Sequence, residues 1–209
     1  CGDVGFGKTE IAIRAIFKAV MSGKQAALLC PTTVLAQQHY ETLKKRFSEY
    51  PIEIDLLSRF KTKTQQKHTL KKILNGTADV IVGTHRLVSK DVIFKNIGLA
   101  IIDEEQRFGV KHKERFKELF KLVDVLTLSA TPIPRTLYLS LMGVKDMSTI
   151  DTAPPGRAPV ETAICPYDEK IMKAAIGREL KRKGQIFFLH NRVKSIQGIR
   201  EIIQEMAPD

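Results

Sequence analysis

The sequence predicts an α/β fold in which helices cover both faces of a parallel β-sheet. The first observation is alternation, because short apolar runs are separated by longer stretches whose apolar residues recur at helical spacing. The second observation is that these runs are apolar throughout, as expected for strands buried on both sides. Five strands are expected: Gln25–Cys30, Ile52–Leu57, Asp79–Gly83, Leu99–Asp103 and Val125–Ser129.

Helices are expected between these strands. The stretch Glu10–Met21 contains no glycine or proline and repeats apolar residues at helical spacing. A second helix is expected over residues 34–47. A third, Lys63–Asn75, is followed by Gly76, a residue type that often ends helices. Lys111–Lys121 is expected to form a further helix, whose basic and acidic side chains alternate on a solvated face.

Three prolines in six residues indicate a linker at Pro154–Pro159. We therefore expect a first domain over residues 1–153, a linker over 154–159 and a second α/β unit over 160–209. Two strands cannot close an independent core, so the second unit is expected to be the truncated start of a domain. Its expected elements are strands at Val160–Ile164 and Gln185–His190 and helices at Asp168–Lys183 and from about Lys194.

Composition and charge limit the class of protein. The chain is 43% hydrophobic and 27% charged, without a membrane-length apolar run or a signal-peptide pattern. Its 3 scattered cysteines are too few for a disulfide framework or a zinc site, so we expect a cytoplasmic protein with no membrane partner. The formal net charge of +11 indicates a polyanionic partner, and Arg59–Lys72, which contains no acidic residue, is the candidate for phosphate contact.

The first nine residues contain a phosphate-binding pattern. Gly2, Gly7, Lys8 and Thr9 fit the spacing G-x-x-x-x-G-K-[ST]. Glycines let successive backbone N–H groups turn toward an anion, and a following helix directs the positive end of its dipole there. Lys8 is then expected to reach the β- and γ-phosphates of ATP, and Thr9 to bind Mg²⁺. The expected nucleotide-binding residues are Gly2, Asp3, Val4, Gly5, Phe6, Gly7, Lys8 and Thr9.

The expected strand at Leu99–Asp103 ends in acidic residues. In a phosphate-loop enzyme the aspartate at this position, Asp103, holds Mg²⁺, and Glu104 would orient and deprotonate the attacking water. An acidic loop after a buried strand is the alternative interpretation. The phosphate-binding pattern in the same chain favours an ATPase, with Lys8, Asp103 and Glu104 as catalytic groups.

Further motifs follow in a recognisable order and resemble motifs Ia, Ic, III and IV of superfamily 2 helicases and translocases. They are Pro31-Thr32-Thr33, Val82-Gly83-Thr84-His85, Ser129-Ala130-Thr131 and Gln185–Arg192. Within that superfamily, the segments Gly2–Glu10 and Asp103–Glu114 resemble those of the Mfd family, the bacterial transcription-repair coupling factors. The resemblance covers essentially the whole chain. It implies a RecA-like first domain followed by the incomplete start of a second RecA-like domain.

The resemblance also implies an ATP-driven motor that moves along double-stranded DNA, displaces stalled RNA polymerase and promotes nucleotide excision repair. RNA polymerase and UvrA would bind parts of the protein outside this chain. Coupling between nucleotide and DNA would involve Gln106, Ser129, Ala130 and Thr131. Contacts with DNA phosphates, rather than bases, are expected because a motor must cross any sequence. The candidates are Thr33, Arg59, Thr84, His85, Arg86, Asn191 and Arg192.

Three alternatives stand beside this interpretation. RecG, a fork-remodelling helicase, usually has serine where Phe6 stands and a Gln-His pair where Glu105 and Gln106 stand. A DNA-binding or scaffold module with a degenerate nucleotide site is disfavoured because Lys8 and Glu104 are intact. A metabolic phosphate-loop kinase would explain neither the Ser-Ala-Thr motif nor the positive charge.

Parts of the superfamily pattern are expected outside these residues. They are the strand before the phosphate loop, the segment that reads adenine and the second-domain arginine that reaches the γ-phosphate. Such an arginine can be worth about 10³–10⁵ in rate. The 209 residues alone are therefore expected to hydrolyse ATP poorly.

Overall fold

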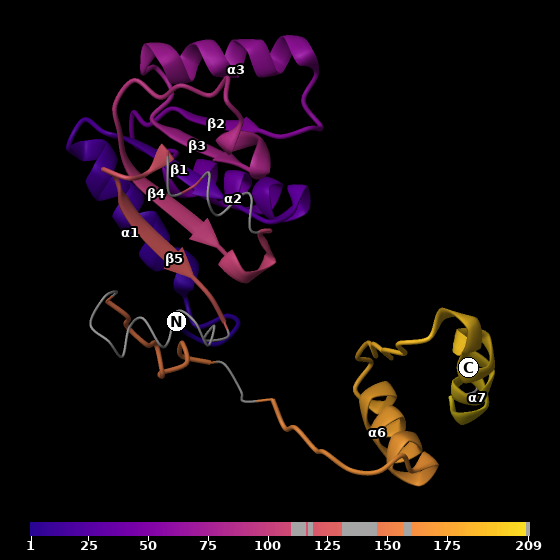
Figure 1. The fold of residues 1–209 in the computed structure, drawn as a ribbon. Helices are drawn as coiled ribbons and strands as arrows, with labels where there is room; N and C mark the ends of the chain where they lie inside the picture. The colour runs from indigo at the N-terminus through magenta and orange to yellow at the C-terminus, as the bar shows by residue number, and fades with distance from the viewer. Residues whose placement is uncertain (110–115, 117–118, 131–145, 157–159, 208–209) are drawn as a thin grey trace. The chain divides into compact units, whose positions relative to one another are not determined.

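The computed structural model describes residues 1–109, 116, 119–130, 146–156 and 160–207 (Figure 1). The chain forms two compact units, Cys1–Arg157 and Ala158–Asp209. Most of the expected helix at Lys111–Lys121 lies outside the described residues, as does Thr131.

A five-stranded parallel sheet forms the centre of the first unit, as the sequence predicts. The strands stand in the spatial order β2-β3-β1-β4-β5. Each boundary lies within two residues of the expected one, because a buried apolar run is a direct signal for a strand covered on both faces. The strands are β1 (Gln25–Leu29), β2 (Ile54–Leu57), β3 (Val80–Gly83), β4 (Ile97–Asp103) and β5 (Asp124–Leu128).

Helices cover both faces of this sheet. On one face, α1 (Lys8–Met21) and α2 (Thr33–Arg46) pack against one set of alternating strand residues. On the other face, α3 (Lys63–Asn75) and the short 3₁₀ helix η1 (His85–Val88) pack against the alternate set. In Figure 1, α3 lies beside the edge strand β2. Because successive strand residues point to opposite faces, the two layers of core follow directly from the apolar runs.

The ends of the helices have local causes. Thr32 Oγ1 accepts a hydrogen bond from the Leu35 N–H at the start of α2. Thr62 and Gln65 form a reciprocal capping box at the start of α3. Gly76, with a φ of 72°, ends α3 in the left-handed conformation, which confirms the expected stop.

The register aligns the carboxyl ends of all strands. One row of paired residues crosses the sheet from β2 to β5: Leu57, Gly83, Leu29, Ile102 and Thr127. The segments that follow the strands therefore leave the sheet at a single edge. Ligands of parallel sheets bind outside this edge, so the polar motifs of the sequence are gathered where a ligand is expected.

The second unit contains helices α6 (Glu169–Lys181) and α7 (Ile196–Met206) and the short 3₁₀ helix η3 (Val193–Ser195). The prediction of strands at Val160–Ile164 and Gln185–His190 is wrong, because neither segment is paired in a ladder with described residues. An apolar run becomes a strand only where a neighbouring strand satisfies its backbone groups.

Candidate functional site

The phosphate loop occupies one end of the carboxyl edge and leads directly into α1, which begins at Lys8. Gly5 and Gly7 have φ values of 78° and 87°, in the left-handed region that glycine adopts without strain. A Cβ added to Gly7 would have no described heavy atom within 4 Å. The loop therefore has both the backbone conformation and the open space that a bound phosphate requires.

Lys8 folds back over this loop. Its Nζ donates hydrogen bonds to the carbonyl oxygens of Gly2, at 2.7 Å, and Asp3, at 2.9 Å. In the part of the chain that the structure describes, the backbone N–H groups of Lys8 and Thr9 donate to no other residue. The ammonium and the start of α1 together place positive charge at the loop, which fits the phosphates of ATP.

Two backbone hydrogen bonds connect the loop to the acidic end of β4. The Gly2 N–H donates to the Ser129 carbonyl oxygen at 3.2 Å. The residue before Ser129 is Leu128, which pairs with Asp103 in the sheet. The Leu128 carbonyl oxygen accepts a hydrogen bond from the Glu104 N–H at 3.0 Å. The phosphate loop, Ser129 and the acidic pair thus lie side by side, as hydrolysis of a nucleoside triphosphate requires.

Asp103 has a buried partner that the sequence interpretation missed. His39 Nε2 lies 2.9 Å from Asp103 Oδ2, and the two side chains are only 11% and 13% exposed. Burial, reinforced by the charge of Asp103, raises the pKa of the nearby Cys30 thiol well above its ordinary value. Helical spacing is the sequence signal that could have indicated this contact, because His39 stands between Ala36 and Leu43 on the buried face of α2. A polar residue on such a face needs a partner.

Glu104 is held by both its backbone and its side chain. Its φ of 51° is in the left-handed region, which costs a non-glycine residue on the order of 1–3 kcal/mol and is common at active sites. The Gln106 amide donates to Glu104 Oε2, and the Ser129 hydroxyl donates to Gln106 Oε1 at 3.4 Å. Gln106 therefore contacts both the expected base and Ser129, a second expected coupling residue, whereas Ala130 is half-buried just after β5.

The expected DNA contacts of the first unit lie mainly at the other half of the edge. Arg59 follows β2, His85 follows β3 and Thr33 begins α2 after β1. Arg59 is exposed, with its guanidinium 5.6 Å from the centre of the Phe60 ring. Because β2, β3 and β1 are neighbours, these residues come from adjoining positions along the edge. The carboxyl edge of the sheet thus divides into a nucleotide half, at the ends of β4 and β5, and a candidate DNA half, at the ends of β2, β3 and β1.

Two of the expected DNA contacts are less suited to that role. The Arg86 guanidinium donates to both carboxylate oxygens of Asp91, at 2.7 and 2.6 Å, and to Gln66 Oε1 at 3.2 Å. This hydrogen bonding lowers the pKa of the Asp91 carboxyl group. Thr84 is only 2% exposed. The ion pair of Arg86 and the burial of Thr84 therefore make these two weaker candidates than the exposed Arg59.

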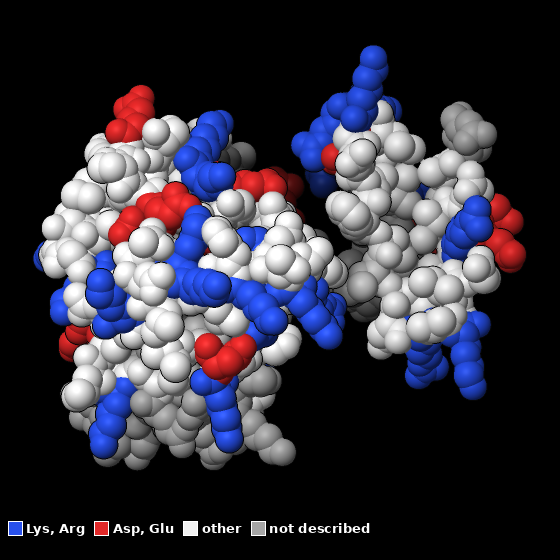
Figure 2. Space-filling model, turned by 90° about the horizontal axis from the view of Figure 1, so that it is seen from above, with Lys and Arg blue, Asp and Glu red and all other residues white. Residues whose placement is uncertain are grey.

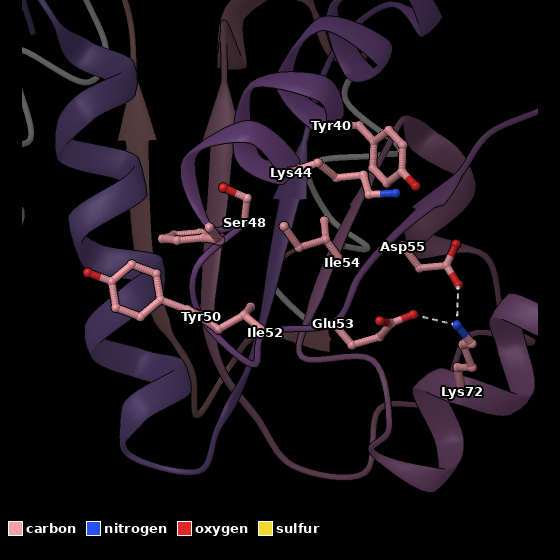
Figure 3. A pocket seen from close by; sticks show the side chains of 10 residues that line it. Tyr40, Lys44, Ser48, Tyr50, Ile52, Glu53, Ile54, Asp55 and Lys72 are labelled. Atoms are coloured by element: carbon pink, nitrogen blue, oxygen red, sulfur yellow. Dashed lines mark hydrogen bonds and ion pairs between the residues drawn. The ribbon is translucent and has the colours of Figure 1, made fainter.

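The basic stretch Arg59–Lys72 is partly neutralised. Lys61 Nζ lies 2.6 Å from Asp55, and Lys72 Nζ lies 2.6 Å from Glu53 and 3.8 Å from Asp55. Figure 3 shows Lys72 pointing toward both acids, beside a pocket between the end of α2 and β2. The remaining basic residues of the stretch are exposed: Arg59, Lys63, Lys67 and Lys71. In Figure 2 lysine and arginine side chains form a band across the face seen from above, with acidic groups beside it.

The candidates of the second unit lie just before η3. Asn191 and Arg192 are exposed, and the Arg192 carbonyl oxygen accepts from the Ser195 N–H at 3.3 Å. His190 Nε2 lies 2.8 Å from Ser195 Oγ. These contacts fix the turn that presents both side chains to solvent.

Comparison with known proteins places this geometry in a family. Residues 1–139 match the DEAD/DEAH box helicases. The chain belongs to this helicase family. Over its full length it is 58% identical to the transcription-repair-coupling factor of Bacillus subtilis (strain 168) and 56% identical to that of Staphylococcus aureus (strain USA300). In both cases it spans 18% of the relative's length.

A solved structure supports the same assignment. The helicase chain resembles RecG bound to a three-way DNA junction, with 38% identity and a TM-score of 0.77 over 98% of this chain and 28% of that one. The predicted RecA-like fold and the resemblance to transcription-repair coupling factors are thereby confirmed.

The residues at the edge also fit a magnesium ion. Thr9 and Asp103 offer hard oxygen ligands of the kind that hold Mg²⁺ together with phosphate oxygens and water. Among the described residues there is no cluster of three or more His, Cys, Asp or Glu side chains that could hold a metal ion. None of the described helices is long and apolar enough to cross a membrane.

Proposed function

We propose that the chain is the nucleotide-binding part of a motor that hydrolyses ATP and moves along double-stranded DNA. The observation that carries this proposal is the connection of the phosphate loop to the Asp103–Glu104 strand end through the Gly2–Ser129 and Glu104–Leu128 hydrogen bonds. It brings a cationic loop and two carboxylates to one edge of the sheet.

Each residue then has a definite role. Mg²⁺-ATP supplies the phosphoanhydride bond that is broken. Lys8 and the start of α1 bind the phosphates, and Thr9 and Asp103 ligate the metal ion. Glu104 orients the attacking water and accepts its proton. Most of the catalytic effect in such a site comes from positioning and charge stabilisation, which fits the backbone and side-chain restraints on Glu104.

DNA binds the other half of the edge through its phosphates. Exposed Arg59, with Thr33 and His85 beside it, would contact the backbone of the duplex, and Asn191 and Arg192 would do so from the second unit. Phosphate contacts bring affinity without sequence preference. Gln106 and Ser129 would transmit the nucleotide state from Glu104.

The complete protein would act in transcription-coupled repair. We infer that it displaces RNA polymerase stalled on DNA and promotes nucleotide excision repair with UvrA, in the cytoplasm, through segments beyond this chain. Identity of 58% to a transcription-repair-coupling factor, against 38% to RecG, supports this over fork remodelling. Fork remodelling is the second candidate, because the RecG structure aligns with 98% of the chain.

ATP turnover of the complete protein tests the motor proposal. Duplex DNA should stimulate the rate, and Glu104→Gln should lower it by about 10²–10⁴, the range expected for loss of a general base, while nucleotide still binds. Glu105→Gln, the neighbouring acid, is the matched control and should retain activity. A rate independent of DNA, or an unaffected Glu104→Gln variant, would refute the motor.

A second assay separates the two candidates. RNA polymerase is stalled on a linear template by withholding one nucleotide, and release of the transcript is followed after addition of protein and ATP. Transcript release without unwinding of a synthetic fork supports the coupling factor. Unwinding of the fork without transcript release supports the RecG-like activity instead.

A further inference from the structure

Helix α2 contacts the metal-binding carboxylate directly. His39 Nε2 lies 2.9 Å from Asp103 Oδ2. An ionised carboxylate can only accept hydrogen bonds, so beside ionised Asp103 the Nε2 atom carries the proton and donates it. Oδ1, the other oxygen of Asp103, has no hydrogen-bond partner among the described residues. His39 therefore holds Oδ2 of Asp103, and Oδ1 of the same carboxylate stays available to a ligand.

The surroundings of this contact restrict its movement. His39 is 9% exposed and stands between Ala36 and Leu43, both of which are buried in the core. Among the described residues, the His39 imidazole is the hydrogen-bond donor to the Asp103 carboxylate. The orientation of the Asp103 carboxylate therefore follows from where α2 holds the His39 imidazole.

We propose that His39 is a positioning residue for Mg²⁺ binding: by holding Oδ2 of Asp103, it orients the carboxylate so that Oδ1 can ligate the ion. The inference rests on the proposed function, because it takes Asp103 as the magnesium ligand. Groups that hydrogen-bond a metal-binding carboxylate orient it, and their loss commonly costs about 10–100-fold in metal affinity or activity.

The same contact connects the two halves of the edge. Thr33, a DNA candidate, is the first residue of α2, and His39 lies six residues further along the same helix. At 1.5 Å per residue the two are separated by about 9 Å of helix. A displacement of α2 when DNA binds would thus move the imidazole, and with it the Asp103 carboxylate. No further side chain is needed between the DNA candidate and the metal ligand.

Two amide variants of the complete protein test this role. In glutamine the amide nitrogen reaches the position of Nε2, whereas in asparagine it reaches only that of Nδ1. His39→Gln should therefore keep the hydrogen bond to Asp103, and His39→Asn should lose it. The first readout is equilibrium binding of a fluorescent ADP titrated with Mg²⁺. His39→Asn should raise the Mg²⁺ concentration at half-maximal binding by about 10-fold or more, and His39→Gln by much less.

The second readout is the ratio of ATPase rates with and without duplex DNA. His39→Asn should reduce this ratio, and His39→Gln should preserve it. Gln38→Asn, on the exposed side of α2, is the control and should change neither readout. Should the Asn variant not fold, as judged by circular dichroism, His39→Met removes the same donor with an apolar side chain and replaces it.

The outcomes separate this inference from the proposed function. If the wild-type protein shows no magnesium-dependent binding of nucleotide, the proposed function itself fails. If the wild type binds as expected but the Asn and Gln variants share one magnesium dependence, His39 has no positioning role. A changed magnesium dependence with an unchanged DNA stimulation ratio would overturn the connection through α2.

Discussion

Gln106 joins Glu104 to Ser129: its amide donates to the Glu104 carboxylate, and its side-chain oxygen accepts from the Ser129 hydroxyl at 3.4 Å. The carbonyl oxygen of the same Ser129 accepts a hydrogen bond from Gly2 of the phosphate loop. A movement of the phosphate loop is therefore transmitted to the Glu104 carboxylate through the Gly2–Ser129 backbone hydrogen bond and the Gln106 side chain.

Gln106→Ala should separate catalysis from binding. Without the amide, Glu104 loses its orientation, and a displacement of about 1 Å can cost on the order of 10²-fold in rate. Nucleotide affinity should change little, because the phosphates are bound by the loop and Lys8. Turnover and equilibrium binding of a fluorescent ADP by the complete protein measure the two effects.

The control for this variant is Gln37→Ala. Gln37 also donates to a glutamate, Glu41, at 2.8 Å, but both lie on the exposed side of α2. Its removal should leave turnover unchanged. An affinity loss in Gln106→Ala as large as the loss of rate would show that the residue holds the nucleotide rather than Glu104.

Arg59→Ala should weaken duplex binding uniformly across unrelated sequences. A phosphate contact contributes roughly 0.9 to the slope of log affinity against log salt, so the slope should become shallower by about 1. Fluorescence anisotropy with two duplexes of unrelated sequence, at several salt concentrations, measures this. Lys95→Ala is the control, because Lys95 precedes β4 and so lies at the opposite edge of the sheet. Equal losses in both variants would mean that the protein binds through general charge alone.

The sheet and the nucleotide half of the edge could be predicted from sequence because their signals are local. An apolar run such as Ala26–Leu29 is buried on both sides, and its polar continuation must then lie at the carboxyl edge. The glycines of the phosphate loop are likewise required by backbone conformation, as the positive φ of Gly5 and Gly7 shows. Neither inference needs knowledge of distant partners.

The features that could not be predicted depend on which residues the folded chain brings into contact, and no local sequence pattern specifies those contacts. His39 meets Asp103 across 64 positions, and only its place on a buried stripe hinted at a partner. Arg86 carries the right charge for DNA, yet its pairing with Asp91 depends on the turn made by η1. The run at residues 185–190 has the composition of a strand, but no described neighbour pairs with it.

Gly83→Ala should destabilise the first unit. A Cβ at this position would lie 2.4 Å from the Leu57 carbonyl oxygen and 2.9 Å from Leu87 Cγ, so backbone in β2 would have to move. Such overpacking typically costs about 1–3 kcal/mol. Thermal unfolding followed by circular dichroism should therefore show a lower midpoint for the variant.

Gly177→Ala is the matched control for that substitution. Gly177 lies within α6, and an added Cβ would meet no described atom within 4 Å. Alanine in a helix is favoured over glycine by about 0.5–1 kcal/mol, so this variant should be neutral or more stable. If Gly83→Ala unfolded at the same temperature as wild type, β2 and β3 would not be as closely packed as the structure has them.

Asp55 gives the first unit a pH dependence whose sign follows from its contacts. Asp55 is 7% exposed, and burial alone would raise its pKa, but the Lys61 ammonium at 2.6 Å and the Leu56 N–H outweigh that effect and hold the pKa below its ordinary value of 3.8. A depressed folded-state pKa stabilises the protein above the unfolded value, and this contribution is lost as the pH falls through the folded value.

Asp55→Asn should therefore be destabilising at pH 7, by about 1–3 kcal/mol, because the Lys61 charge is left without its partner. As the pH falls through the depressed folded-state pKa, the wild-type carboxyl group also takes up a proton, so the difference between the two proteins should shrink. Urea denaturation at pH 7 and at about pH 3.5 compares the midpoints. Asp91→Asn, which breaks a more exposed pair with Arg86, should give a smaller difference at pH 7. A gap between Asp55→Asn and wild type that is the same at both pH values would mean that the substitution acts through packing rather than through the charge of Asp55.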